Sequence, residues 1–162
     1  MRRAAPGMVE DVVSSLIEVL RSRLCRSLTA HEAECIAAAT VLRRVPAGAS
    51  LRAEGDQALG LIFLVRGTGE IRRGAPAKGS PVIAAVEAPT MLGEVSLLTG
   101  ELASATIQAQ TECECYILTR SQFQRLLESE SRAIGKLVIA IAEGLARKLT
   151  SMNDRIAERS RA

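Results

Sequence analysis

The segment from residue 91 to residue 106, M-L-G-E-V-S-L-L-T-G-E-L-A-S-A-T, contains residue types that could bind a small anionic molecule. Gly93 permits a backbone conformation that is closed to other residues and lets a ligand approach the main chain. The small residues at 103–105 leave their backbone N–H groups uncovered, and successive uncovered N–H groups form an anion-binding nest. The residues expected to contact the ligand are Leu92, Gly93, Glu94, Val95, Ser96, Ala103, Ser104 and Ala105.

Glu94 has a different role in this interpretation, because a carboxylate cannot bind an anion. Its oxygens are suited to accept hydrogen bonds from sugar hydroxyl groups. A short helical turn over residues 95–98 would direct its N-terminus toward the same place. The segment therefore predicts a site for a molecule that carries both a phosphate and sugar hydroxyls.

This segment resembles the phosphate-binding cassette of cyclic nucleotide-binding domains. The family pattern, F-G-E-x-A-L followed by P-R-x-A-T, matches residues 92–97 and 102–106 without a gap. The resemblance implies cAMP or cGMP as the candidate ligand, and the sequence indicates no metal or other cofactor. The arginine that pairs with the cyclic phosphate in this family is replaced by Ala103, and its preceding proline by Leu102. We therefore expect cyclic nucleotide binding to be weak or lost.

The composition limits the partners of the chain. Its 162 residues are 48% hydrophobic and 24% charged, as in an ordinary soluble domain. Aromatic residues make up 2% and the net charge is only +3, so we expect no nucleic acid partner. No apolar run is long enough to span a membrane, and Arg2-Arg3 is not followed by the apolar core of a signal peptide. We expect no membrane partner, a cytoplasmic location and cysteines that remain thiols.

The segments around the cassette predict an α+β fold. Apolar residues recur at helical spacing over 8–25, and a second helix begins after Thr29, whose capping-box partner is Glu32, and ends near residue 40. Short β-type runs separated by glycine and proline follow from residue 41, and residues 105–110 and 112–118 are predicted as the last two strands. The resemblance, which covers about residues 28–156, implies turns of a β-roll at Gly48, Gly55 and Gly67.

The predicted fold is an antiparallel, jelly-roll-like β-roll flanked by N-terminal helices and a long C-terminal helix. We divide the chain into an N-terminal helical segment (1–28), a cyclic nucleotide-binding-like β-roll (29–120) and C-terminal helices for dimerisation and for covering the pocket (121–162).

The second C-terminal helix has an apolar stripe with near-heptad spacing. Its members are Ile134, Val138, Ile141, Leu145, Leu149, Met152 and Ile156. The stripe could pack on its own β-roll or pair with another protomer. The resemblance favours a homodimer through Ile134 to Ile156, with the same helix covering the pocket. The chain ends shortly after this helix, so we expect no helix-turn-helix domain.

Three functions are consistent with these features. The first is a stand-alone regulatory module, dimeric, that senses a small nucleotide-type ligand and signals to a protein partner. The second is a ligand-independent dimeric scaffold. The third is a redox or metal sensor using Cys25, Cys35, Cys113 and Cys115, although alternation places Cys113, Cys115 and Ile117 on one strand face, as expected for core residues. We expect no enzyme, because the single histidine, His31, lies at a helix start and builds no catalytic constellation.

Overall fold

The computed structural model describes residues 6–57, 59–74 and 79–161, with side chains from residue 13 onward. Arg2-Arg3, the side chains of Val9 and Val12, and residues 75–78 of the predicted polar loop lie outside this part. The strands are β1 (Val41–Val45), β2 (Ser50–Arg52), β3 (Leu61–Arg66), β4 (Thr68–Arg72), β5 (Val82–Glu87), β6 (Thr90–Leu92), β7 (Thr106–Ala109) and β8 (Cys113–Leu118). The helices are α1 (Pro6–Val19), the π-helical turn η1 (Leu20–Leu24), α2 (Ala30–Ala38), α3 (Glu94–Thr99), α4 (Arg120–Ser129) and α5 (Ser131–Arg161).

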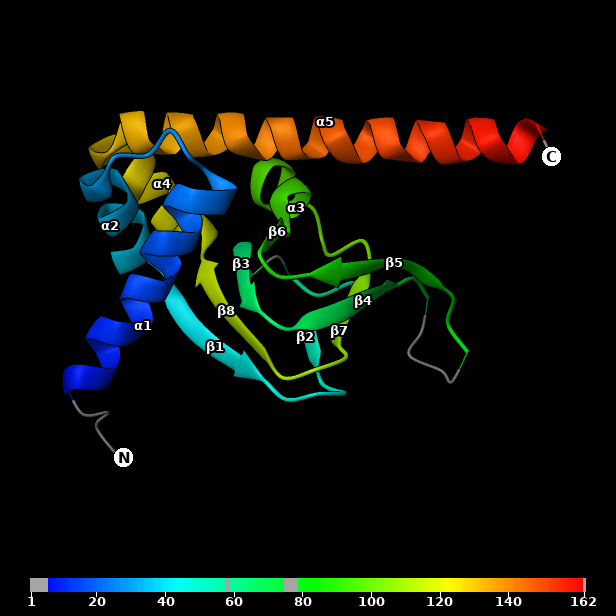
Figure 1. The fold of residues 1–162 in the computed structure, drawn as a ribbon, viewed down its shortest axis with the longest axis horizontal. Coiled ribbons are helices and arrows are strands. Elements are labelled where there is room, and N and C mark those ends of the chain that lie inside the picture. Colours follow the sequence, from blue (N-terminus) through cyan, green and yellow to red (C-terminus); the bar gives the residue numbers. More distant parts are fainter. Residues whose placement is uncertain (1–5, 58, 75–78, 162) are drawn as a thin grey trace.

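The strands form two antiparallel sheets of four strands each. The first sheet has the order β1-β8-β3-β6 and the second the order β2-β7-β4-β5. Apart from α5, the helices gather beside the first sheet (Figure 1). Helix α5 runs across these helices and continues past the strands. This α+β architecture, with a β-roll between N-terminal helices and a long C-terminal helix, confirms the predicted fold class.

One hydrophobic cluster joins the helices to the first sheet. Its fully buried members include Leu16, Leu20, Ile36, Phe63, Tyr116, Ile134 and Leu137. The capping box that starts α2 is present as predicted: Thr29 Oγ1 accepts the Glu32 N–H at 3.2 Å, and Glu32 Oε2 accepts the Thr29 N–H at 2.8 Å. The same Glu32 oxygen accepts a hydrogen bond from Lys136 Nζ at 2.6 Å, so the cap also attaches α2 to α5.

A second cluster fills the space between the two sheets. It contains Val45, Leu51, Ile62, Leu64, Leu92, Ile107, Cys113, Cys115 and Ile117. The shared face predicted for Cys113, Cys115 and Ile117 is confirmed, since all three belong to this cluster while Tyr116 between them faces the helices. Because successive side chains of β8 point to opposite faces of the sheet, this strand contributes residues to both hydrophobic clusters.

The chain changes sheets at Gly67, which the sequence analysis placed at a turn. The segment from residue 61 to residue 73 is two strands in different sheets, β3 and β4, joined at this glycine. Gly67 has a φ of +100°, and a Cβ there would lie 2.5 Å from the Glu112 carbonyl oxygen. A side chain is excluded by conformation and by space. Strand β6, three residues long, was not predicted.

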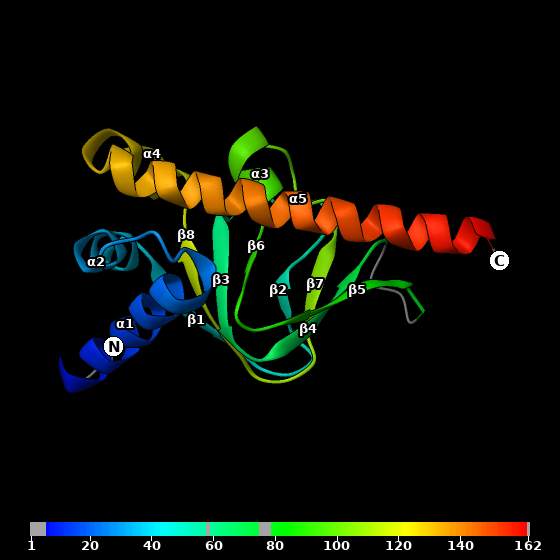
Figure 2. The same cartoon turned by 45° about the horizontal axis from the view of Figure 1, so that its top comes forward.

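Helix α5 spans 31 residues, and its two halves differ in environment. Ile134 and Ile141 are fully buried against the chain's own helices, whereas Leu149, Met152 and Ile156 are each about 60% exposed. Figure 2 shows the second half of the helix continuing beyond α3 toward and past the β5 end of the roll. The predicted stripe therefore divides: its first half packs on this chain, and only its second half is open to a partner. None of the described helices is both long and apolar enough to cross a membrane.

Candidate functional site

The predicted ligand-binding segment borders a cavity of about 190 Å³ between the second sheet, α3 and α5. Several residues predicted from the sequence line it, namely Leu92, Gly93, Glu94, Val95, Ser104 and Ala105. Side chains from β4 and β7, Ile71 and Ile107, form apolar walls, and Leu145 of α5 closes one side. With Arg52 of β2, residues from five separate parts of the sequence therefore meet at one cavity.

Gly93 allows the chain to turn into the cavity. It has a φ of +80° and lies directly before α3. A Cβ at this position would lie 2.7 Å from the Gly60 carbonyl oxygen and 3.1 Å from Arg52 Nη1. Glycine is therefore required by its conformation and by two close neighbours.

Two predicted residues, Ser96 and Ala103, do not line the cavity. Ser96 is buried behind it, and its Oγ is 3.4 Å from Arg52 Nη1. Ala103 is also buried, and its N–H donates to the Asp56 carbonyl at 2.9 Å while its own carbonyl accepts the Gly55 N–H at 2.8 Å. The backbone of Ala103 holds the β2–β3 turn instead of facing the cavity. Of the predicted nest, Ser104 and Ala105 border the cavity.

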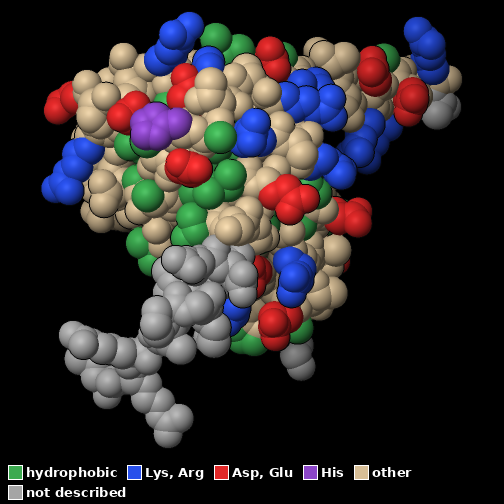
Figure 3. All heavy atoms as spheres, turned by 60° about the vertical axis from the view of Figure 1, so that its left-hand side comes forward, with side chains coloured by type: hydrophobic (Ala, Val, Ile, Leu, Met, Phe, Trp, Pro, Cys, Tyr) green, Lys and Arg blue, Asp and Glu red, His purple; other side chains and the backbone are tan. Residues whose placement is uncertain are grey.

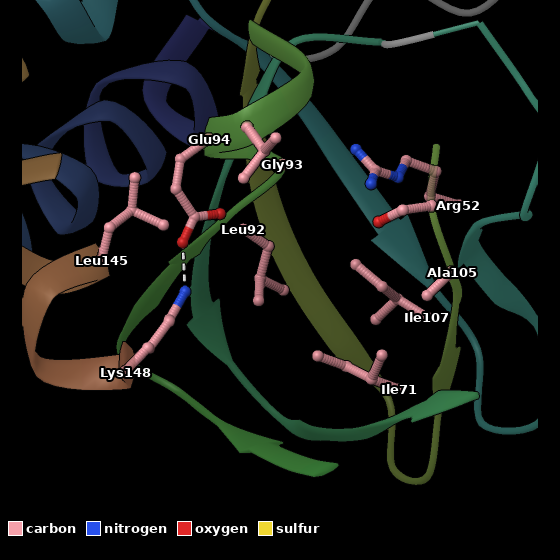
Figure 4. Close-up of a pocket in the computed structure, with 11 residues that line it drawn as sticks. Arg52, Ile71, Leu92, Gly93, Glu94, Ala105, Ile107, Leu145 and Lys148 are labelled. Atoms are coloured by element: carbon pink, nitrogen blue, oxygen red, sulfur yellow. Dashed lines mark hydrogen bonds and ion pairs between the residues drawn. The ribbon is translucent and has the colours of Figure 1, made fainter. Parts of the chain in front are cut away.

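Glu94 is buried and forms an ion pair with Lys148 of α5 at one side of the cavity (Figure 4). The Glu94 side chain is 10% exposed and the Lys148 side chain 51% exposed, so Lys148 lies on the solvent side of the pair. Lys148 was missed because it lies 54 residues beyond Glu94 and is one of many charged residues in α5. The expectation that the long helix covers the pocket could have directed attention to basic residues of this helix such as Lys148.

Arg52 is the second basic residue that sequence analysis missed. It ends β2, is only 7% exposed and lines the cavity opposite Lys148 (Figure 4). Leu51 and Arg52 are both buried although they are neighbours, which strict alternation forbids. The register between β2 and β7 shifts between Ser50 and Arg52, and such an irregularity redirects side chains.

The guanidinium of Arg43 in β1 stabilises this irregularity. Its Nη1 donates to the Leu51 carbonyl at 2.8 Å and its Nη2 to the Ser50 carbonyl at 3.3 Å. Burial lowers the pKa of Arg52, and the nearby carboxylates of Glu94 and Asp56 oppose this shift. An arginine remains protonated in a protein, so the cavity contains a buried positive charge.

The cysteines do not assemble into one site. All four are free thiols, and Cys113 and Cys115 lie in the core, where burial raises the pKa of Cys115 to about 11. Among the described residues, the side chains that lie close enough together to hold a metal ion are those of His31, Cys35 and Glu130. Only one of the four cysteines belongs to this group. Figure 3 shows the single histidine on the surface with acidic side chains around it.

Comparison with known proteins identifies the family of the chain. A family model, cyclic nucleotide-binding domain, matches residues 42–130, more than half of the chain. The chain belongs to the cyclic nucleotide-binding domain family.

Solved structures share the fold. A cyclic nucleotide-binding domain from Methylobacillus flagellatus KT superposes with a TM-score of 0.82 at 22% identity, covering 93% of this chain and 85% of that one. The catabolite activator protein of Thermus thermophilus gives a TM-score of 0.71 at 23% identity, over 86% of this chain and 63% of that one. Among curated proteins, human patatin-like phospholipase domain-containing protein 6 is 24% identical over 85% of this chain. The chain spans about a tenth of the length of that relative.

Proposed function

We propose that this protein is a regulatory module that binds a small nucleotide-type ligand in the cavity and signals its occupancy through α5 to a protein partner. Membership of the cyclic nucleotide-binding domain family supports the ligand class. The resemblance to the Thermus thermophilus activator supports a regulatory role instead of a catalytic one. cAMP and cGMP are the first ligands to test.

The ion pair between Glu94 and Lys148 is the observation that carries this proposal. Glu94 belongs to the ligand-binding segment, and Lys148 belongs to the helix that leaves the domain. Lys148 Nζ binds Glu94 Oε1, so a ligand hydroxyl that binds the Glu94 carboxylate must share this group with the Lys148 ammonium. Ligand binding therefore changes a contact that holds α5.

The size of the cavity supports the same mechanism. Its volume of about 190 Å³ is below the ~300–1,000 Å³ that is usual for small-molecule pockets. Lys148 and Leu145 of α5 both border it, so displacing this helix enlarges it. A nucleotide would thus stabilise an arrangement in which α5 has shifted away from the cavity.

We further propose that the second half of α5 is the contact surface between two copies of the chain. Leu149, Met152 and Ile156 follow one another at helical spacing and are each about 60% exposed. An exposed apolar row on a helix is suited to packing against the same row of a second helix. A dimer formed here would begin one residue beyond Lys148, so the cavity and the dimer contact share one helix.

Calorimetry with cAMP and cGMP tests this proposal, together with amide hydrogen exchange of α5. We expect binding by the wild type, weakening by about ten- to a hundredfold in Glu94→Gln, and altered exchange in α5 on binding. Glu101→Gln is the matched control, because Glu101 is an exposed glutamate of the same segment. If the wild type binds neither nucleotide and still forms a dimer, the ligand-independent scaffold is the better interpretation.

A further inference from the structure

Arg52 is a buried cation without an ion-pair partner among the described residues. Among the residues whose burial the structure describes, the other three charged or polar residues buried to a similar degree are Glu32, which pairs with Lys136, Glu94, which pairs with Lys148, and the neutral Ser96. Within the described residues, the hydrogen-bond acceptor of Arg52 Nη1 is the Ser96 hydroxyl at 3.4 Å. Its Nε is buried, and no acceptor for it lies within the described part of the chain.

This arrangement is costly for the folded protein. A buried charge needs a counter-ion or a full set of hydrogen bonds to offset its lost hydration. Burial accordingly lowers the pKa of Arg52, and the nearby carboxylates of Glu94 and Asp56 offset this shift only in part. The irregular β2–β7 pairing, held by Arg43, nevertheless places this guanidinium inside the roll. The structure thus keeps an unsatisfied donor group at the wall of a cavity.

The surroundings of Arg52 are suited to an anion. Backbone around Gly93, Ser104 and Ala105 borders the cavity with it, and these small residues leave space for ligand oxygens beside the main chain. Glu94, the acidic group of the cavity, is held by Lys148 on the other side (Figure 4). Apolar side chains, including Leu92 and Ile107, form the wall between these two polar ends.

We infer that Arg52 is the anion receptor of this cavity and binds the phosphate of a phosphodiester-type ligand whose hydroxyl groups bind Glu94. This inference rests on the proposed function and specifies its chemistry. Arginine pairs with phosphate through parallel N–H donors, which would satisfy the buried Nε and the neighbouring Nη together. The positive charge that Ala103 cannot supply therefore comes from β2, outside the ligand-binding segment.

Comparison of a cyclic nucleotide with its nucleoside isolates the phosphate contact. The wild type is expected to bind cAMP about ten- to a hundredfold more tightly than adenosine in calorimetry. In Arg52→Gln this ratio should fall to near one, with adenosine affinity unchanged. Arg52→Lys keeps the charge without the parallel donors and should give an intermediate ratio. Arg44→Gln, which removes an exposed arginine of β1, should keep the wild-type ratio.

Stability of the ligand-free protein provides a second measurement. Replacing an unpaired buried charge by an apolar side chain of similar length is neutral or stabilising. Arg52→Met should therefore unfold at the wild-type temperature or above it, while losing the stabilisation by cAMP. A clear decrease in its unfolding temperature would show that Arg52 serves the fold, and this would overturn the inference.

The two proposals fail in different ways. A wild type that binds cAMP and adenosine equally, or an Arg52→Gln variant that keeps the wild-type ratio, overturns the role of Arg52 and leaves the sensory function standing. A wild type that binds neither compound contradicts both.

Discussion

Replacing Lys148 by methionine should loosen α5 by a measurable amount. The Glu94 side chain is 10% exposed, so its carboxylate is largely removed from water, whereas the Lys148 side chain is 51% exposed. Exposed ion pairs contribute about 0.2–1 kcal/mol, and removing one partner of a fully buried pair costs about 3–5 kcal/mol. This pair lies between these cases, so we expect a loss of about 1–2 kcal/mol. For a chain of this length the unfolding temperature should fall by about 2–8 °C.

Differential scanning fluorimetry measures this change, with Arg155→Met as the control because Arg155 is an exposed basic residue of the same helix. Calorimetry on the same proteins tests the competition for Glu94. Lys148→Met frees the carboxylate before ligand arrives, so adenosine should bind about fivefold more tightly, equivalent to about 1 kcal/mol. Unchanged stability would show that the pair does not hold α5. Weaker adenosine binding would show that Lys148 assists the ligand instead of competing with it.

Three further predictions concern other parts of the molecule. Met152→Glu should give a folded monomer by analytical ultracentrifugation, because a charge would enter the proposed dimer contact; unchanged mass would place that contact elsewhere. The hydrogen bonds from Lys136 and Thr29 lower the pKa of Glu32, so its contribution to stability is complete above the unfolded pKa of glutamate and disappears as the pH falls through the lower folded value. When urea unfolding is measured from neutral pH to about pH 3, the free energy of unfolding should therefore fall less steeply with pH in Lys136→Met than in the wild type. Equal slopes in the two proteins would refute this coupling. Iodoacetamide should label Cys35 before Cys113 and Cys115, because the Cys35 thiol is partly exposed whereas the other two are buried; equal rates by mass spectrometry would revive the redox interpretation.

Local signals made most of the fold predictable from the sequence. The capping box of Thr29 and Glu32 depends on two residues of one turn, and the alternation along β8 depends on six consecutive residues, so neither requires knowledge of distant contacts. The change of sheet at Gly67 was harder to predict because β3 and β4 are separated by that single residue. Its glycine indicated a turn, but the sheet to which each strand belongs is decided by pairing with β8 and β7.

The site was predictable only where its residues are contiguous. The segment around Gly93 and Glu94 lines the cavity because one short stretch carries both groups. Arg52 could not be found by alternation, because the register shift in β2 reverses the direction in which its side chain points. Lys148 could not be found by proximity in sequence, because only the path of α5 over the roll brings it to Glu94.

Helix α5 has the geometry of a lever arm. Near its beginning Lys136 is fixed to Glu32 of α2, farther along Lys148 meets Glu94 at the cavity, and Ile156 lies in the exposed second half of the helix. At a rise of about 1.5 Å per residue, the cavity is about 18 Å from the fixed point and Ile156 about 30 Å. A tilt about Lys136 that moves Lys148 by one ångström therefore moves Ile156 by roughly 1.7 Å. In the proposed mechanism, a small displacement at the cavity would therefore produce a larger one at the exposed apolar end of the helix.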